Sequence, residues 1–122
     1  KGDSLDTNTG IAGYKAVSEV YSRAASPDGI IGANVSITLG ILRYLYEKNI
    51  RVPKEVSLIG HEDSVMYGYS APALSAINIK KDLVGTEAVK IMMDRINNGE
   101  SETISGITIQ PSLKERDSVA KR

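Results

Sequence analysis

The apolar positions of the chain alternate between helix-like and strand-like patterns. Within residues 9–25 they recur at helical spacing, whereas residues 29–33 form a short apolar run typical of a buried strand. A second helical pattern occupies residues 37–49, and residues 56–59 form another buried run. This order predicts a helix followed by a strand, a helix and a parallel strand.

The second half of the chain is predicted to contain one more helix. Residues 61–74 are rich in Gly, Ser and Tyr without a clear period, which indicates an ordered loop or a short helical turn, and residues 75–79 are expected to be extended. Asp82 is expected to cap a helix that stops at residues 97–99, and the alternating residues 104–109 predict a half-buried strand. The apolar stripe of this helix comprises Val84, Ala88, Ile91, Met92 and Ile96.

Polar residues precede the first two helices. Thr7 or Thr9 is placed to cap the first, and Asn34 and Ser36 can cap the second. Helices alternating with short apolar strands predict an α/β fold with three αβα layers and a mostly parallel sheet. Ligand sites in such sheets lie at the carboxyl ends of the strands, which here are followed by Asn34 and by residues 60–62.

Composition narrows the class of protein. The 122 residues are 41% hydrophobic and 25% charged, as in ordinary soluble domains, so we expect a cytoplasmic protein with no membrane contact. Fifteen basic residues balance fifteen acidic ones, which disfavours DNA binding by these residues alone. With no cysteine, one histidine and no phosphate-loop or nucleophile-elbow spacing, we expect neither an enzyme nor a bound cofactor.

Several segments carry a family pattern in a constant order. Residues 26–34 resemble a proline-led strand that ends in Ala-Asn-Asp, and residues 52–63 are similar to Val-Pro-Glu-Asp-Val-Ser-Val-Ile-Gly-Phe-Asp-Asp. Residues 72–77 occupy the place of Pro-Pro-Leu-Thr-Thr-Ile, and residues 113–118 resemble Leu-Ile-x-Arg-x-Ser. Leu39-Gly40, Gly85 and Ala88 match two helix motifs of the same family. By these motifs the chain is identified as a member of the LacI/GalR family of transcription regulators.

This resemblance implies a periplasmic-binding-protein-like domain of two lobes, with a small-molecule effector in the cleft between them. It assigns residues 1–79 to the C-terminal lobe and residues 80–103 to a crossing segment whose helix packs on the N-terminal lobe. Residues 104–122 become a return strand and tail. We therefore expect a partial domain, whose helix over 80–103 exposes its apolar stripe and whose DNA-reading headpiece lies outside the chain.

Two polar residues are the main candidates for effector binding. Asn34 matches an asparagine with which family members hydrogen-bond the effector, although an asparagine before a helix is also an ordinary cap. Glu62 stands where the family has a ligand-binding aspartate, and its carboxylate can accept two hydrogen bonds from sugar hydroxyls. A solvent-exposed loop acid is the alternative for Glu62.

Further candidates are His61, Ser36 and Asn8. His61 replaces a family aromatic, and a lone histidine there is more often a packed ring than a ligand; a metal site at residues 61–63 is disfavoured because adjacent side chains diverge. Asn8 replaces a stacking aromatic, and Val35 replaces an aspartate. We expect a weaker grip on a small sugar or polyol than is usual in the family, and little grip on a planar base.

The expected function is the effector-sensing and dimerisation part of a regulator that binds a sugar-like molecule. The resemblance implies a homodimer, formed partly by the helix that carries Leu39 and by the loop after Gly60, and contact with operator DNA only through the headpiece. A periplasmic solute-binding protein shares the fold and is the alternative. The Val-Pro-Lys-Glu-Val-Ser and Leu-x-x-Arg-x-Ser patterns favour the regulator.

Overall fold

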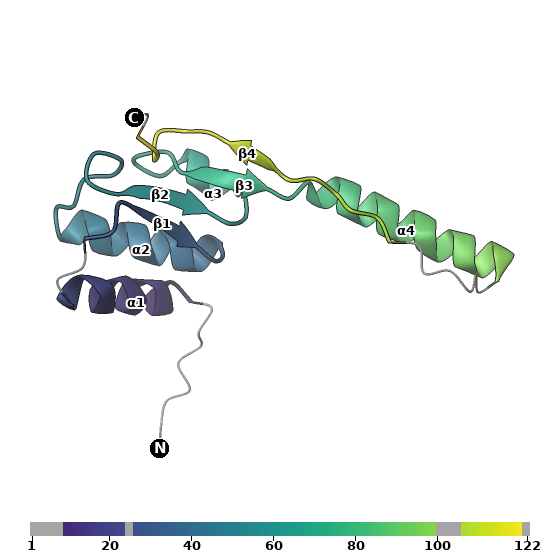
Figure 1. The fold of residues 1–122 in the computed structure, drawn as a ribbon, viewed down its shortest axis with the longest axis horizontal. Helices are drawn as coiled ribbons and strands as arrows, with labels where there is room; N and C mark the ends of the chain where they lie inside the picture. The colour runs from purple at the N-terminus through teal and green to yellow at the C-terminus, as the bar shows by residue number, and fades with distance from the viewer. Residues whose placement is uncertain (1–8, 24–25, 100–105, 121–122) are drawn as a thin grey trace, which may run out of the picture.

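The computed structural model describes residues 9–23, 26–99 and 106–120. Four helices and four strands follow one another along these residues, as Figure 1 shows. They are α1 (Gly10–Ser22), β1 (Gly29–Gly32), α2 (Val35–Glu47), β2 (Ser57–Gly60), α3 (Val65–Gly68), β3 (Ser75–Asn78), α4 (Lys81–Asn98) and β4 (Ser112–Lys114).

The four strands form one sheet in the order β1-β2-β3-β4. The first three strands are parallel, with Gly32 paired to Gly60 and Gly60 to Ala76, whereas β4 runs antiparallel to β3. This confirms the predicted α/β fold with a mostly parallel sheet. Because the register is shared, the carboxyl ends of β1, β2 and β3 lie side by side at one edge of the sheet.

Helix α2 packs between the sheet and α1 (Figure 1). Two glycines make the contact between the helices close: a Cβ on Gly13 would overlap the backbone of Ile37, and one on Gly40 would overlap the backbone of Gly10. Leu45 of α2 and Leu58 of β2 are completely buried in the hydrophobic core. The opposite face of β1 is open, since Ile31 is 66% exposed.

The C-terminal tail fastens the strands together. The Ser118 hydroxyl donates to the Leu58 carbonyl in β2 and accepts from the Ser75 amide in β3 at 2.8 Å, while the Ser118 carbonyl accepts from the Leu58 amide at 2.9 Å. Arg116 donates through its backbone amide to the Ser75 hydroxyl at 2.8 Å. The serine and arginine of the Arg-x-Ser motif therefore tie the two central strands together.

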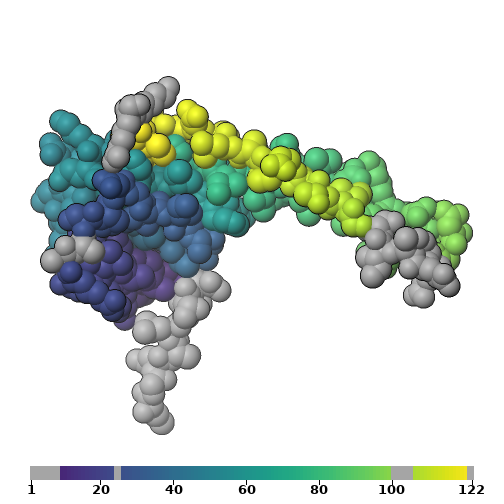
Figure 2. All heavy atoms as spheres, in the orientation of Figure 1, coloured from purple at the N-terminus to yellow at the C-terminus, as the bar shows by residue number. Residues whose placement is uncertain are grey.

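Helix α4 extends away from this body (Figures 1 and 2). None of its 18 residues is buried. Most of the predicted apolar stripe is confirmed as exposed, with Val84 at 45%, Met92 at 61% and Ile96 at 69%, whereas Ile91 is half-buried. Within the described residues, no helix combines the length and apolar character needed to cross a membrane.

The structure corrects the predicted boundaries at three places. The first helix ends at Ser22, three residues before the predicted Ala25, which itself lies outside the described residues. Asp82 is not a cap: α4 begins at Lys81, and Asp82 lies in its first turn. The strand predicted over 104–109 is wrong in its described part, because β4 forms only at Ser112–Lys114, where the backbone reaches β3.

Candidate functional site

The candidate site lies at the carboxyl edge of the sheet. Three polar residues follow the strands at this edge, each two positions after a residue of one paired row: Asn34 after Gly32, Glu62 after Gly60 and Asn78 after Ala76. The strand register therefore brings them to the same edge. The His61 amide donates to the Gly32 carbonyl at 2.8 Å and extends the pairing past the end of β1. The structure thus brings together the two strand ends that carry the predicted ligand residues.

Asn34 is the N-cap of α2 and is half-buried. Its side-chain oxygen accepts a hydrogen bond from the Ile37 amide at 2.9 Å, and its carbonyl accepts one from the Thr38 hydroxyl at 2.6 Å. The capping role is therefore confirmed. The amide oxygen is thus used by the helix, and the NH₂ group of Asn34 forms no hydrogen bond with the described residues.

Glu62 forms an ion pair with Lys81 at the start of α4. The Glu62 side chain is 32% exposed and the Lys81 side chain 56%, so the pair is reachable from solvent. Lys81 was not among the residues selected from the sequence. It stands 19 positions from Glu62, and nothing local in the sequence links the two.

Asp63, the residue after Glu62, forms ion pairs with residues of the C-terminal tail. Its carboxylate accepts from Arg116 at 2.7 Å and from Lys114 at 3.2 Å, and its side chain is only 19% exposed. Burial alone would raise the pKa of Asp63, but the hydrogen bonds from Arg116 and Lys114 outweigh it and hold this pKa below its ordinary value. Asp63 therefore has a structural role, and Glu62 is the acid left at the edge.

A hollow of about 490 Å³ opens where β3 passes into α4; Lys81 is on its wall, whereas Glu62 and Asn34 are not among the residues that line it. Such a volume is in the range of small-ligand sites. The Asn78 side-chain oxygen accepts from the Lys80 amide at 2.9 Å and so shapes the turn into α4. The hollow is lined by Asp63, Asn78, Ile79, Lys80, Lys81, Asp82 and Leu83.

The other predicted ligand residues are more scattered. The His61 side chain is exposed, and Ser36 lines a groove of about 710 Å³ between α1 and α2. Asn8 lies outside the described residues. Ligand binding by Asn34, Glu62, His61, Ser36 and Asn8 stays a prediction.

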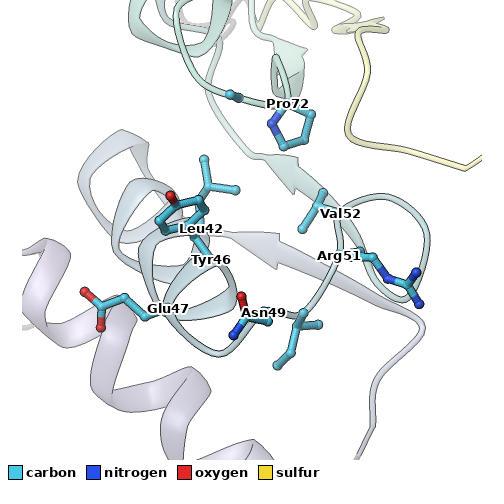
Figure 3. A pocket seen from close by; sticks show the side chains of 9 residues that line it. Leu42, Tyr46, Glu47, Asn49, Arg51, Val52 and Pro72 are labelled. Atoms are coloured by element: carbon cyan, nitrogen blue, oxygen red, sulfur yellow. The ribbon is translucent and has the colours of Figure 1, made fainter.

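A third hollow, of about 610 Å³, lies between the end of α2 and the loops that lead into β2 and β3 (Figure 3). Leu42, Tyr46, Arg51 and Pro72 contribute to its wall. These loops precede the strands, so this hollow belongs to the amino edge of the sheet. It contains none of the residues predicted to bind an effector.

Tyr67 in α3 lies next to Gly60, the last residue of β2, at the carboxyl edge of the sheet. Its side chain is completely buried, packs over Gly60, and its hydroxyl has no hydrogen bond of good geometry within the described part of the chain. Burial raises the pKa of Tyr67, and the nearby Thr38 hydroxyl offsets part of the effect. The glycine at position 60 is needed here because any side chain would overlap the tyrosine ring.

The chain matches the periplasmic binding protein-like domain family over residues 4–119. It is 36% identical to the HTH-type transcriptional repressor PurR of Escherichia coli over 109 residues, which are 89% of this chain and 32% of the repressor. The chain thus spans about a third of the length of the curated relatives it matches.

Solved structures agree with this match. A LacI-type transcription regulator from Bifidobacterium animalis has a TM-score of 0.84 at 28% identity, over 93% of this chain and 40% of that one. The transcriptional regulator CelR in complex with cellobiose has a TM-score of 0.82 at 28% identity, over 91% and 34%. The chain belongs to the periplasmic binding protein-like domain family, as part of an effector-binding domain of the LacI/GalR type.

Proposed function

We propose that the chain is the effector-sensing part of a LacI/GalR-type DNA-binding transcription regulator, and that its effector is a sugar or a sugar derivative. The observation that carries the proposal is the placement of Asn34 and Glu62 at the ends of neighbouring parallel strands. An amide donor and a carboxylate acceptor suit the hydroxyl groups of a polyol. The binding of cellobiose by the similar regulator CelR supports this class of effector.

The test is calorimetric titration of the full-length protein with ribose, glucose and cellobiose, and with adenine as a planar, non-sugar probe. We expect at least one sugar to bind and Glu62→Gln to weaken it by about 1–3 kcal/mol, because a charged acceptor is lost. Glu55→Gln is the matched control, since Glu55 pairs with Arg51 at the other edge of the sheet. Equal affinity in wild type and Glu62→Gln would contradict the role of Glu62.

We further propose that the full-length protein is a homodimer in which α3 contributes to the interface. Three residues in and next to α3 support this, because Val65 is 75% exposed, Met66 54% and Tyr69 86%. Exposed apolar side chains clustered on one short element commonly mark protein contacts. Sedimentation of the variant Met66→Glu should show a larger monomer fraction than wild type, and an unchanged dimer would contradict this assignment.

A further inference from the structure

The pairing of Glu62 with Lys81 changes what the effector site offers to a ligand. The Lys81 ammonium donates to one carboxylate oxygen, Oε1, of Glu62, and no described residue bonds to the other oxygen, Oε2. A carboxylate alone presents only acceptors. Together with an ammonium group, which carries three donors, it presents an acceptor and a donor side by side.

The backbone around Lys81 holds this arrangement in place. Lys80 adopts a left-handed conformation with φ of 52°, and its amide donates to the Asn78 side chain, so the chain turns sharply between β3 and α4. The turn places Lys81 next to Glu62 and on the wall of the 490 Å³ hollow. Lys90, farther along α4, also forms an exposed ion pair and does not line this hollow, which makes it a natural comparison.

We propose that Lys81 is a specificity-determining residue of the effector site, an inference that rests on the proposed function of Glu62. Oε2 of Glu62 accepts a hydrogen bond from one effector hydroxyl, and the Lys81 ammonium donates to the oxygen on the adjacent carbon. The pair therefore selects a sugar with two adjacent oxygen groups. A polyol that has only one oxygen at this place satisfies half of the pair and leaves the other half unpaired.

The experiment uses calorimetric titration of the full-length protein and the variants Lys81→Met, Lys81→Arg, Glu62→Gln and Lys90→Met. The probes are ribose, glucose and cellobiose, followed by the monodeoxy analogues of whichever binds tightest. We expect Lys81→Met to weaken this sugar at least about tenfold, as when a hydrogen bond to a charged group is lost. Lys81→Arg should bind more tightly than Lys81→Met, because the positive charge and the donors remain, and Lys90→Met should stay within about twofold of wild type.

The deoxy analogues separate a ligand contact from a structural effect. The analogue that lacks the hydroxyl bound by Glu62 should bind wild type more weakly than the parent sugar does, but should bind Glu62→Gln almost as tightly as the parent sugar. The analogue altered at the neighbouring carbon should bind wild type more weakly, but should bind Lys81→Met almost as tightly as the parent sugar. Thermal unfolding should be nearly the same for Lys81→Met and Lys90→Met, because each loses one solvent-exposed ion pair and such a pair contributes little stability. A loss of fold would lower the affinity for every analogue alike.

Two results would overturn the assignment. If sugars bind but Lys81→Met binds them like wild type, or if every deoxy analogue loses the same affinity in Lys81→Met as in wild type, Lys81 does not contact the effector. The role of Glu62 then still stands if Glu62→Gln weakens the sugar. If no sugar binds to folded wild-type protein, the proposed sugar-sensing function itself fails, and the role of Lys81 with it.

Discussion

Helices α2 and α4 have similar sequence patterns and very different surroundings. Both carry an apolar stripe at helical spacing, yet five of the 13 residues of α2 are buried and none of the 18 residues of α4 is. Helix α2 has the sheet on one side and α1 on the other, whereas α4 leaves the body of the molecule (Figure 1). An amphipathic pattern thus determines that a helix forms, and its neighbours determine whether its apolar side is covered.

The glycines of the two helices show the same contrast. A Cβ on Gly40 in α2 would overlap the backbone of Gly10, whereas a Cβ on Gly85 in α4 would meet nothing within 4 Å. A glycine is required only where another element packs so closely that a side chain would overlap it. The body containing α2 should therefore respond to small changes of volume that α4 tolerates.

The largest difference between the two regions is expected for truncated apolar side chains. Leu45→Ala removes a completely buried side chain in α2 and should lower the free energy of unfolding by about 2–5 kcal/mol through lost burial and a residual cavity. Met92→Ala on α4, where the side chain is 61% exposed, should change it by less than about 0.5 kcal/mol. Urea unfolding of both variants measures the difference. A Met92→Ala cost equal to that of Leu45→Ala would show that α4 is covered in the protein studied.

Adding one methyl group should give opposite signs in the two helices. Gly40→Ala should destabilise by about 1–3 kcal/mol, because α1 and α2 must move apart. Gly85→Ala should stabilise by up to about 1 kcal/mol, since alanine is the better helix former and has free space. Thermal unfolding of the two variants and the wild type measures both changes in stability. If both changes have the same sign, the predicted contrast between the two helices is wrong.

The body also contains a group that lowers its stability. Tyr67→Phe removes a buried hydroxyl without good hydrogen-bond geometry and should raise the free energy of unfolding by about 1 kcal/mol. Tyr69→Phe is the control, because this ring is 86% exposed and should change little. If Tyr67→Phe destabilises the protein instead, the hydroxyl has a partner in solution.

The smallest expected effect concerns the dependence of stability on pH. The folded protein holds the pKa of Asp63 below its unfolded value, so this carboxylate adds stability above the unfolded value of about 3.9, and the contribution is lost as the pH falls through the lower folded pKa. Acid unfolding of Asp63→Asn should therefore show a smaller loss of stability between about pH 4 and pH 2 than wild type. Parallel curves would contradict the assigned role of the Asp63 ion pairs.

Local chemistry made much of the fold predictable from the sequence. Thr and Asn before a helical pattern predict caps, and of the candidates Thr7 or Thr9 and Asn34 or Ser36 the structure shows Thr9 and Asn34 accepting from an amide three residues ahead. The parallel strands were recognised from short apolar runs between helices. The carboxyl edge with Asn34 and Glu62 followed from the same order, because parallel strands bring their ends to one edge.

Only the tertiary structure decided which distant residues meet. Glu62 pairs with Lys81, 19 positions away, and Asp63 pairs with Arg116, 53 positions away. The sequence alone does not indicate which acidic residue pairs with which basic residue. The last strand forms at Ser112–Lys114 although residues 104–109 have the better alternating pattern, since a strand requires a partner in register. The sequence by itself determined the three long helices, the three parallel strands and the family, because these depend on neighbours along the chain. The ion pair at the carboxyl edge depends on where the turn at Lys80 directs the backbone in space.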